Sequence, residues 1–271
     1  MGESSRVSVI DLSGRRLLVT GGGSGIGRAV ALGAAAAGAR VVVAGRRTGA
    51  LEETAGAASG PGEVTTFAAD VADPEAVRSL VEACVGRLGG LDGLVHAAGV
   101  HSIGASADLD DTEFDRVLRI NLMGAFRVTR EVGRVMLRQR GGSIVQVASL
   151  SSFGAFPGRL AYAVSKAGVA EMTLTLAAEW GRRAVRVNAL VPGFVRTPIQ
   201  DSLVERGLLD LGALEARTPL GRRAETADMV GPTLFLLSDA ARFVTGHCLV
   251  VDGGWLPFVG PVDHYASDAG R

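Results

Sequence analysis

The stretch from Leu17 to Gly45 constrains the fold of this chain more than any other part of it. The apolar run LLVT (17–20) leads into the glycine-rich turn TGGGSGIG (20–27), which is followed by small, helix-compatible residues from Arg28 to Ala37. Gly38 then precedes a second apolar run, RVVVAG (40–45). This order predicts a strand, a tight turn, a helix with a glycine C-cap, and a second strand.

The same alternation continues along the chain. Helical spacing of apolar residues predicts a helix over 74–88, after a proline at its first position, one long helix over 114–137, and another over 161–181. Short apolar runs predict further strands at 64–70, 91–99, 142–149, 184–193 and 247–254.

The strands are near-continuous runs of Val, Leu and Ala, which is typical of strands covered by helices on both faces. We therefore expect an α/β fold, a Rossmann-type, doubly wound, seven-stranded parallel sheet with helices on both faces. No linker divides the 271 residues, so 1–271 is expected to be a single domain with its core at about 10–255 and a C-terminal tail at 256–271. The irregular segment 196–222 is expected to act as a substrate loop or lid, although a disordered loop without a role is also possible.

Composition narrows the choice of partner and compartment. Lys plus Arg equals Asp plus Glu at 28 each, which gives no general attraction for nucleic acid or for an anionic membrane. The N-terminus lacks the apolar core of a signal peptide, and no run is apolar enough to span a bilayer. Cys84 and Cys248 are expected to be buried thiols in a reducing compartment. These features predict a soluble, cytoplasmic protein with a small-molecule partner.

The glycine turn indicates a dinucleotide cofactor. Gly21, Gly25 and Gly27 let the backbone turn sharply and approach a pyrophosphate at a helix N-terminus. The acidic residue that usually binds the ribose 2′-hydroxyl is replaced by Gly45, and Arg46 and Arg47 follow. A missing carboxylate and two guanidiniums suit a 2′-phosphate, so NADP(H) is favoured over NAD(H), with Arg46 as the preferred contact. The alternative is that one or both arginines only form a solvated end of the strand and bind no phosphate.

Several motifs recur in order at compatible spacings: TGGGSGIG, HAAG (96–99), Asn121 in RINLMGAF, Ser149 in VQVASLSS, YAVSK (162–166), VPGFVRTP (191–198) and TGHCLVVDGG. Together they resemble the short-chain dehydrogenase/reductase family, in the single-domain branch typified by 3-oxoacyl-carrier-protein reductases. The resemblance implies an active site of Asn121, Ser149, Tyr162 and Lys166. His96 and Ala97 depart from the two asparagines found in many members.

The resemblance also implies the cofactor contacts. With Arg46 and Arg47 added from the strand end, the expected set is Gly21, Gly23, Ser24, Gly25, Ile26, Gly27, Asp70, Val71, Ala97, Ala98, Gly99, Asn121, Tyr162, Lys166, Pro192, Gly193, Val195 and Thr197. Asp70 is equally compatible with a turn-forming role.

The chemistry of carbonyl reduction explains this choice of residue types. Hydride addition builds negative charge on oxygen, which an acid must protonate, and the same group serves as base in reverse. Tyr162 is the expected acid, and Lys166, one helical turn away, is expected to lower its pKa. Ser149 is expected to donate to the substrate oxygen, and Asn121 to hold a water near Lys166. Taken alone, a Tyr and a Lys at this spacing are more often an ordinary surface pair.

The sequence leaves two alternatives to an NADP(H)-dependent oxidoreductase: a non-catalytic dinucleotide sensor or scaffold, and an NAD-dependent alcohol dehydrogenase. The family resemblance also implies a homotetramer. No metal site is expected, because His96 and His101 lack cysteine or carboxylate partners. The substrate cleft is expected to be largely apolar with two arginines near its rim, formed by Phe153, Phe156, Arg159, Leu160, Phe194, Arg196, Ile199 and Leu203.

Overall fold

The computed structural model describes residues 10–258, and seven parallel strands form one sheet in the order β3-β2-β1-β4-β5-β6-β7. The strands are β1 (Arg16–Thr20), β2 (Arg40–Gly45), β3 (Glu63–Ala68), β4 (Gly93–His96), β5 (Gly142–Val147), β6 (Val185–Pro192) and β7 (Cys248–Val251). The predicted doubly wound, seven-stranded parallel sheet is confirmed. The order reverses between β1 and β4, which is where such sheets bind their ligands.

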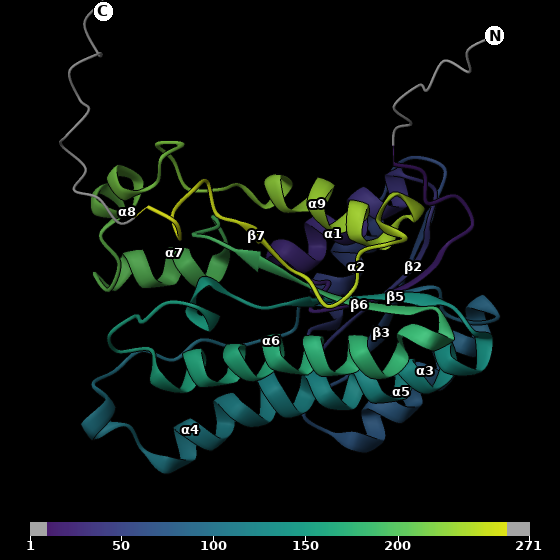
Figure 1. Cartoon of the computed structure of the whole chain (residues 1–271), viewed down its shortest axis with the longest axis horizontal. Helices are drawn as coiled ribbons and strands as arrows, with labels where there is room; N and C mark the ends of the chain where they lie inside the picture. The colour runs from purple at the N-terminus through teal and green to yellow at the C-terminus, as the bar shows by residue number, and fades with distance from the viewer. Residues whose placement is uncertain (1–9, 259–271) are drawn as a thin grey trace, which may run out of the picture.

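Helices cover both faces of the sheet, as Figure 1 shows. The helices are α1 (Gly25–Ala36), α2 (Thr48–Gly56), α3 (Pro74–Leu88), α4 (Asp111–Leu118), α5 (Gly124–Gln139), α6 (Leu160–Trp180), α7 (Pro198–Glu205), α8 (Leu211–Arg217) and α9 (Val230–Leu237). In Figure 1, α1 and α9 lie above the sheet, and α3, α5 and α6 lie below it. None of the helices in residues 10–258 is both long and apolar enough to cross a membrane.

Side chains that alternate along the central strands pack into two hydrophobic clusters, one on each face of the sheet. Leu17 and Val19 of β1 pack with α1 and α9 in one cluster, whereas Leu18 packs with α3 and α5 in the other. Successive side chains of a strand point to opposite faces, so a continuous apolar run fills both layers.

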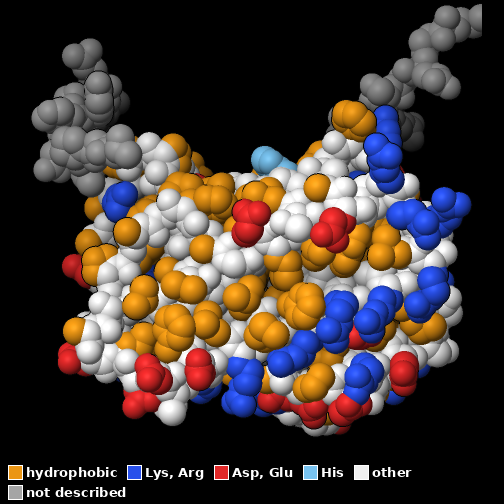
Figure 2. All heavy atoms as spheres, turned by 60° about the horizontal axis from the view of Figure 1, so that its bottom comes forward, with side chains coloured by type: hydrophobic (Ala, Val, Ile, Leu, Met, Phe, Trp, Pro, Cys, Tyr) orange, Lys and Arg blue, Asp and Glu red, His pale blue; other side chains and the backbone are white. Residues whose placement is uncertain are grey.

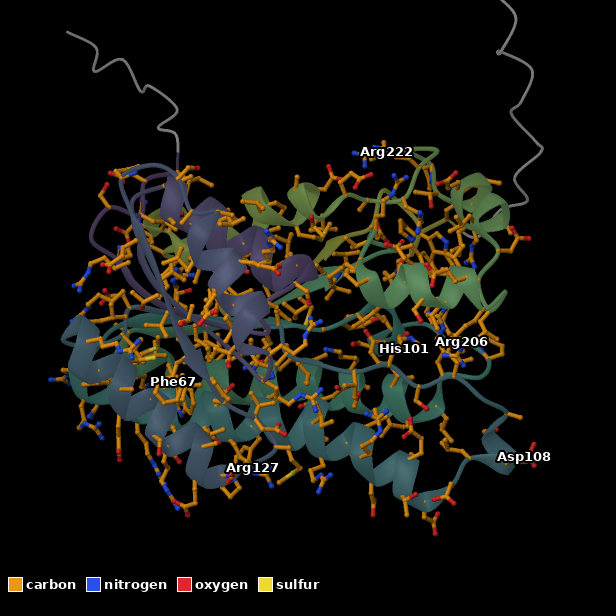
Figure 3. All side chains as sticks on the ribbon, turned by 180° about the vertical axis from the view of Figure 1, so that it is seen from behind. Phe67, His101, Asp108, Arg127, Arg206 and Arg222 are labelled. Atoms are coloured by element: carbon orange, nitrogen blue, oxygen red, sulfur yellow. The ribbon has the colours of Figure 1, made fainter. Side chains whose placement is uncertain are left out.

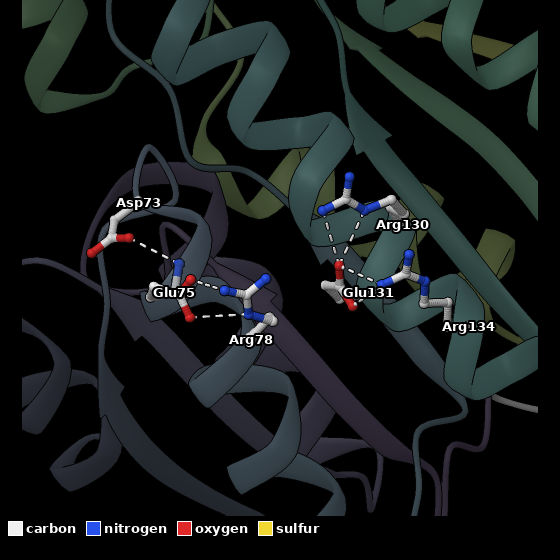
Figure 4. A network of polar contacts seen from close by, with 6 residues as sticks. All are labelled: Asp73, Glu75, Arg78, Arg130, Glu131 and Arg134. Carbon is white, nitrogen blue, oxygen red and sulfur yellow. Dashed lines mark hydrogen bonds and ion pairs between the residues drawn. The ribbon is translucent and has the colours of Figure 1, made fainter.

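The start of α3 shows how local sequence sets an element. The carboxylate of Asp73 accepts a hydrogen bond from the Glu75 backbone N–H at 2.9 Å, and Pro74 occupies the first turn. Arg78 pairs with Glu75 on the exposed side, as does Arg134 with Glu131 on α5 (Figure 4). The cap and proline fix where the helix begins, while exposed ion pairs of this kind add little stability.

The region predicted as one long helix over 114–137 is interrupted. A π-helical segment, Arg119–Met123, separates α4 from α5. Within it, the buried side chain of Asn121 bonds to the backbone of Val100, in the loop after β4. That bond is a tertiary contact, which the spacing of apolar residues cannot reveal.

Two other predictions need correction. The segment 196–222 is not irregular, because it contains α7 and α8, capped by Thr197 and Asp210. Cys84 is buried as predicted, but Cys248 is only partly buried because it lies on β7, an edge strand. The tail beyond residue 258 lies outside the described residues.

Candidate active site

The glycine turn after β1 makes a close approach between backbones at the carboxyl ends of two strands. Gly21 has φ +70°, and a Cβ there would lie 2.7 Å from the backbone nitrogen of Ala98. A Cβ on Gly27 would collide with the carbonyl of Gly21. Gly25, with φ +55°, starts α1. Only glycine suits these positions, and the bare turn leaves room beside the α1 N-terminus for a charged group.

Two adjoining hollows run across the carboxyl ends of the strands and share residues of the glycine turn and of the loop after β4. One hollow contains Gly23, Arg46, Arg47, Asp70 and Val71. The other contains the rest of the predicted cofactor set apart from Asn121, namely Gly25, Ile26, Gly27, Ala97, Tyr162, Lys166, Pro192, Gly193, Val195 and Thr197, while Gly21, Ser24, Ala98 and Gly99 line both. The shape and lining fit an extended dinucleotide.

The end of the cleft that is expected to bind the adenosine carries the two exposed arginines, Arg46 and Arg47. Arg47 donates a hydrogen bond to the Ser24 hydroxyl at 3.3 Å, which ties it to the glycine turn. Within residues 10–258, Arg46 has no such side-chain bond or ion pair, so its guanidinium is available to a ligand. Asp70 accepts from the Ala72 backbone N–H at 2.9 Å and so does form a turn, while still lining the hollow.

Tyr162, Lys166 and Ser149 meet at the other end. Tyr162 and Lys166 come from successive turns of α6, and Ser149 follows β5 as the cap of a short 3₁₀ turn, accepting from the Ser151 N–H at 3.1 Å. Lys166 is buried, at 6 % exposure, and its Nζ donates to the Val147 carbonyl at 2.7 Å. The helix and the strand end therefore bring the three predicted side chains to one wall.

The charge balance at Tyr162 differs from the expectation. Burial raises the pKa of Tyr162, and this is opposed by a hydrogen bond with Ser149 and by the positive charge of Arg159. The Lys166 ammonium is directed at the Val147 carbonyl and lies 5.8 Å from the centre of the phenol ring. Burial lowers the pKa of Lys166 itself to about 8. Arg159 is thus a cation near Tyr162 that favours its phenolate, a role that was not predicted from the sequence.

Asn121 lies behind this wall and not on it. Its amide accepts from the Val100 N–H at 2.8 Å and donates to the Val100 carbonyl at 2.9 Å and to Ser165 Oγ at 3.1 Å. The side chain is thus fully used in joining the π-helical segment to the loop after β4 and to α6. In this structure Asn121 fixes the site's framework, and its side chain does not line the cleft.

Two histidines adjoin the site. His101 stacks on the Tyr162 ring with centroids 4.4 Å apart, and burial lowers its pKa to about 4, helped by Arg159 and Lys166. Figure 3 shows His101 between α7 and the helices below the sheet. His96 is buried, with Nδ1 2.9 Å from Thr20 Oγ1, and burial lowers its pKa to about 3. The stacking on Tyr162 was not predicted, and no sequence pattern signals it.

The substrate end of the cleft is partly as predicted. Phe156, Arg159, Phe194, Ile199 and Leu203 line it, together with Leu209, which was not predicted. Phe153 and Leu160 are instead exposed, at 50 % and 46 %. Arg196 points away and pairs with Glu225 at 3.3 Å. Residues of α7 line the cleft, and the role of 196–222 as a substrate loop stays a prediction.

The fold and this cleft are typical of α/β proteins with a dinucleotide site at the switch point of a doubly wound sheet; here a tyrosine, a serine and a lysine lie at one end of the cleft.

Comparison with known proteins narrows that class. A family model described as enoyl-(acyl carrier protein) reductase matches residues 21–256. A 3-oxoacyl-acyl-carrier-protein reductase of Thermotoga maritima is 38% identical over 244 residues, covering 90% of this chain and 98% of the relative. The structure of a short-chain type dehydrogenase/reductase from Mycobacterium marinum superposes with a TM-score of 0.87 at 36% identity, covering 92% and 98%.

A third relative, a structure from Beutenbergia cavernae, contains NADP at low occupancy; it is 40% identical with a TM-score of 0.84 and coverage of 92% and 100%. This chain belongs to the short-chain dehydrogenase/reductase family of oxidoreductases.

Proposed function

We propose that the protein is an NADP(H)-dependent oxidoreductase that interconverts a ketone and a secondary alcohol, with Tyr162 as general acid and base. The observation that carries this proposal is the meeting of Tyr162, Ser149 and Lys166 at one end of a cleft whose other end is the glycine turn. Bound in the cleft, the nicotinamide supplies or accepts the hydride.

Each side chain has a role that its position supports. The Ser149 hydroxyl, next to Tyr162, can donate to the carbonyl oxygen and hold it beside the phenol. Tyr162 gives its proton to that oxygen as negative charge develops, which suits a phenol that burial keeps protonated. The Lys166 ammonium lies 3.7 Å from where a Cβ on Gly99 would stand, a place from which it can hold the ribose of the cofactor.

The proposed preference for NADP(H) over NAD(H) rests on the residues at the end of β2. Gly45 offers no carboxylate to a ribose hydroxyl, and Arg46 stands beside it with an unengaged guanidinium that matches a phosphate. The NADP in the Beutenbergia cavernae relative is in keeping with this choice. An NAD-dependent alcohol dehydrogenase is the alternative within the same class.

We also propose a homotetramer. Figure 2 turns the layer of α4, α5 and α6 toward the viewer and shows hydrophobic side chains over much of it. Phe126, Val164 and Leu174 are each about two-fifths exposed there, more than isolated apolar residues would explain. Light scattering at micromolar concentration should give a molecular mass equal to that of four chains, and the mass of a monomer would refute the proposal.

The test of function separates an enzyme from a dinucleotide sensor on the same fold. NADPH oxidation is followed with a panel of ketones, and NADPH binding is measured separately. Turnover of at least one ketone is expected. Tight NADPH binding without turnover of any ketone or oxidation of any alcohol would favour the sensor.

A further inference from the structure

Arg159 lies in the hollow next to Tyr162 and forms no ion pair with an acidic residue in the part of the chain that the structure describes. Its side chain is partly buried, and its guanidinium lies 5.4 Å from the ring centre of Phe156 and 5.8 Å from that of Phe194. Within residues 10–258, no Asp or Glu lines the hollow that contains Arg159. Burial lowers the pKa of Arg159, and the phenolate form of Tyr162 opposes this effect.

The neighbouring arginines are engaged. Arg196 pairs with Glu225, and Arg223 lies 3.7 Å from Asp201 and 3.9 Å from Glu215. Arg217 packs on the Trp255 ring at 3.6 Å. Arg159 therefore differs from the others around the site: it is desolvated like a structural arginine but lacks the anion that normally accompanies one.

The position of Arg159 relative to the reacting group is fixed by local structure. Arg159 is the residue that caps α6, its carbonyl accepts from the Ala163 N–H at 2.8 Å, and Tyr162 follows three residues later on the same side of the helix. An anion held by Arg159 would thus lie close to the oxygen that Tyr162 protonates.

The aromatic wall fixes the orientation of the guanidinium. Phe156, Phe194 and Trp255 pack together, with ring centres 5.2 to 6.2 Å apart. A guanidinium that lies over aromatic rings keeps its N–H edge available, and that planar edge matches the two oxygens of a carboxylate.

We propose that the substrate carries a carboxylate a few bonds from its carbonyl and that Arg159 binds this carboxylate. The proposal rests on the proposed oxidoreductase function and adds a substrate class, short oxo acids and hydroxy acids, together with the residue that selects them. A carboxylate is favoured over a phosphate because a single guanidinium in an otherwise apolar wall balances one negative charge.

The test compares an acid with its own neutral ester. NADPH oxidation is measured with acetoacetate and levulinate and with their methyl esters, for the wild type, Arg159→Gln and Arg159→Lys. Arg196→Gln is the matched control, because it removes a nearby positive charge that is already paired. The readout is the ratio of kcat/KM for acid to that for ester, since any effect of Arg159 on Tyr162 cancels in this ratio.

The wild type should prefer the acids, and Arg159→Gln should lower the ratio about tenfold to a hundredfold, mainly through the KM for the acids. The ratio for Arg159→Lys should lie between those of the wild type and Arg159→Gln, because lysine keeps the positive charge but loses the planar pair of N–H donors. Arg196→Gln should leave the ratio within about twofold. A wild-type ratio near one, or an unchanged ratio in Arg159→Gln, would overturn the proposal while leaving the oxidoreductase function intact.

Calorimetry distinguishes a failure of the proposed carboxylate site from a failure of the proposed oxidoreductase function. Levulinate is titrated into the protein saturated with NADP⁺, where no hydride is available for its reduction. Binding that is lost in Arg159→Gln and kept in Arg196→Gln supports the carboxylate site even if every ketone proves inert, in which case only the proposed function fails. Equal binding by wild type and Arg159→Gln refutes the carboxylate site.

Discussion

At the scale of single residues, cofactor choice depends on what stands at the end of β2. A Cβ added to Gly45 would meet only Leu51 Cδ2, at an ordinary contact distance of 3.5 Å, and Gly45 does not have a positive φ. Position 45 can therefore accept a side chain without strain, and the absence of a carboxylate there is a matter of chemistry and not of space.

We expect Gly45→Asp to reverse the preference between cofactors. The new carboxylate would repel a 2′-phosphate and accept from a 2′-hydroxyl, so kcat/KM with NADPH should fall at least tenfold and that with NADH should rise. Gly49→Asp adds the same charge on exposed α2, at a position with nothing within 4 Å, and should change either value by less than about threefold. Equal loss with both cofactors would contradict the assignment of Arg46.

Some residue-scale features could be predicted from sequence and others could not. The glycine turn and the pair of Tyr162 and Lys166 are recognisable because one turn or one helix fixes their spacing, whereas Ser149, after β5, is recognised from the family resemblance. The stacking of His101 on Tyr162 and the engagement of Arg196 by Glu225 are contacts between distant segments. The direction of the Lys166 ammonium likewise depends on β5, a different element.

At the scale of elements, α5 packs closely against α6 because α5 has a glycine, Gly133, where it meets the Trp180 ring. A Cβ on Gly133 of α5 would collide with the Trp180 ring at the end of α6. The helix pair carries Tyr162, Lys166 and, through the π-helical segment, Asn121, so this contact supports the site.

Replacing Gly133 and Gly86 by alanine should change stability in opposite directions. Gly133→Ala overpacks the α5–α6 contact and should lower the free energy of unfolding by about 1–3 kcal/mol. Gly86→Ala, at an exposed position of α3 with nothing within 4 Å, should raise it by about 0.5–1 kcal/mol, because alanine is the better helix former. Urea unfolding measures both, and a stabilised Gly133→Ala would show that the contact tolerates a larger side chain.

The element boundaries were predictable where the sequence carries its own signals. The helix α3 begins at Pro74 and ends at Leu88 as predicted, with Gly89 as its C-cap. The break between α4 and α5 and the helices α7 and α8 were missed, because the first depends on a bond to Val100 and the others are short helices in a stretch without strong periodicity.

At the scale of the whole molecule, stability should depend on pH through a buried histidine. The pKa of His96 is about 3 in the folded protein and near 6.5 when unfolded, so between these values the unfolded chain binds more protons. The free energy of unfolding should then fall as pH drops below about 6.5, with a slope of about 1.4 kcal/mol per pH unit from this residue.

His96→Asn should lower stability at neutral pH and make the decline between pH 6 and pH 4 shallower by about that slope. His247→Gln, which removes an exposed histidine, is the matched control and should leave the slope unchanged. Urea unfolding at several pH values provides the measurement; parallel curves for wild type and His96→Asn would contradict the assignment.

The proposed function requires Tyr162 as the proton donor. The most direct measurement is the rate of NADPH oxidation with the best ketone of the panel, for wild type and Tyr162→Phe, with NADPH affinity determined alongside. The phenylalanine variant keeps the ring that stacks on His101 and removes only the hydroxyl. We predict a fall in kcat of at least about a hundredfold at nearly unchanged NADPH affinity; equal turnover by the two proteins would contradict the account.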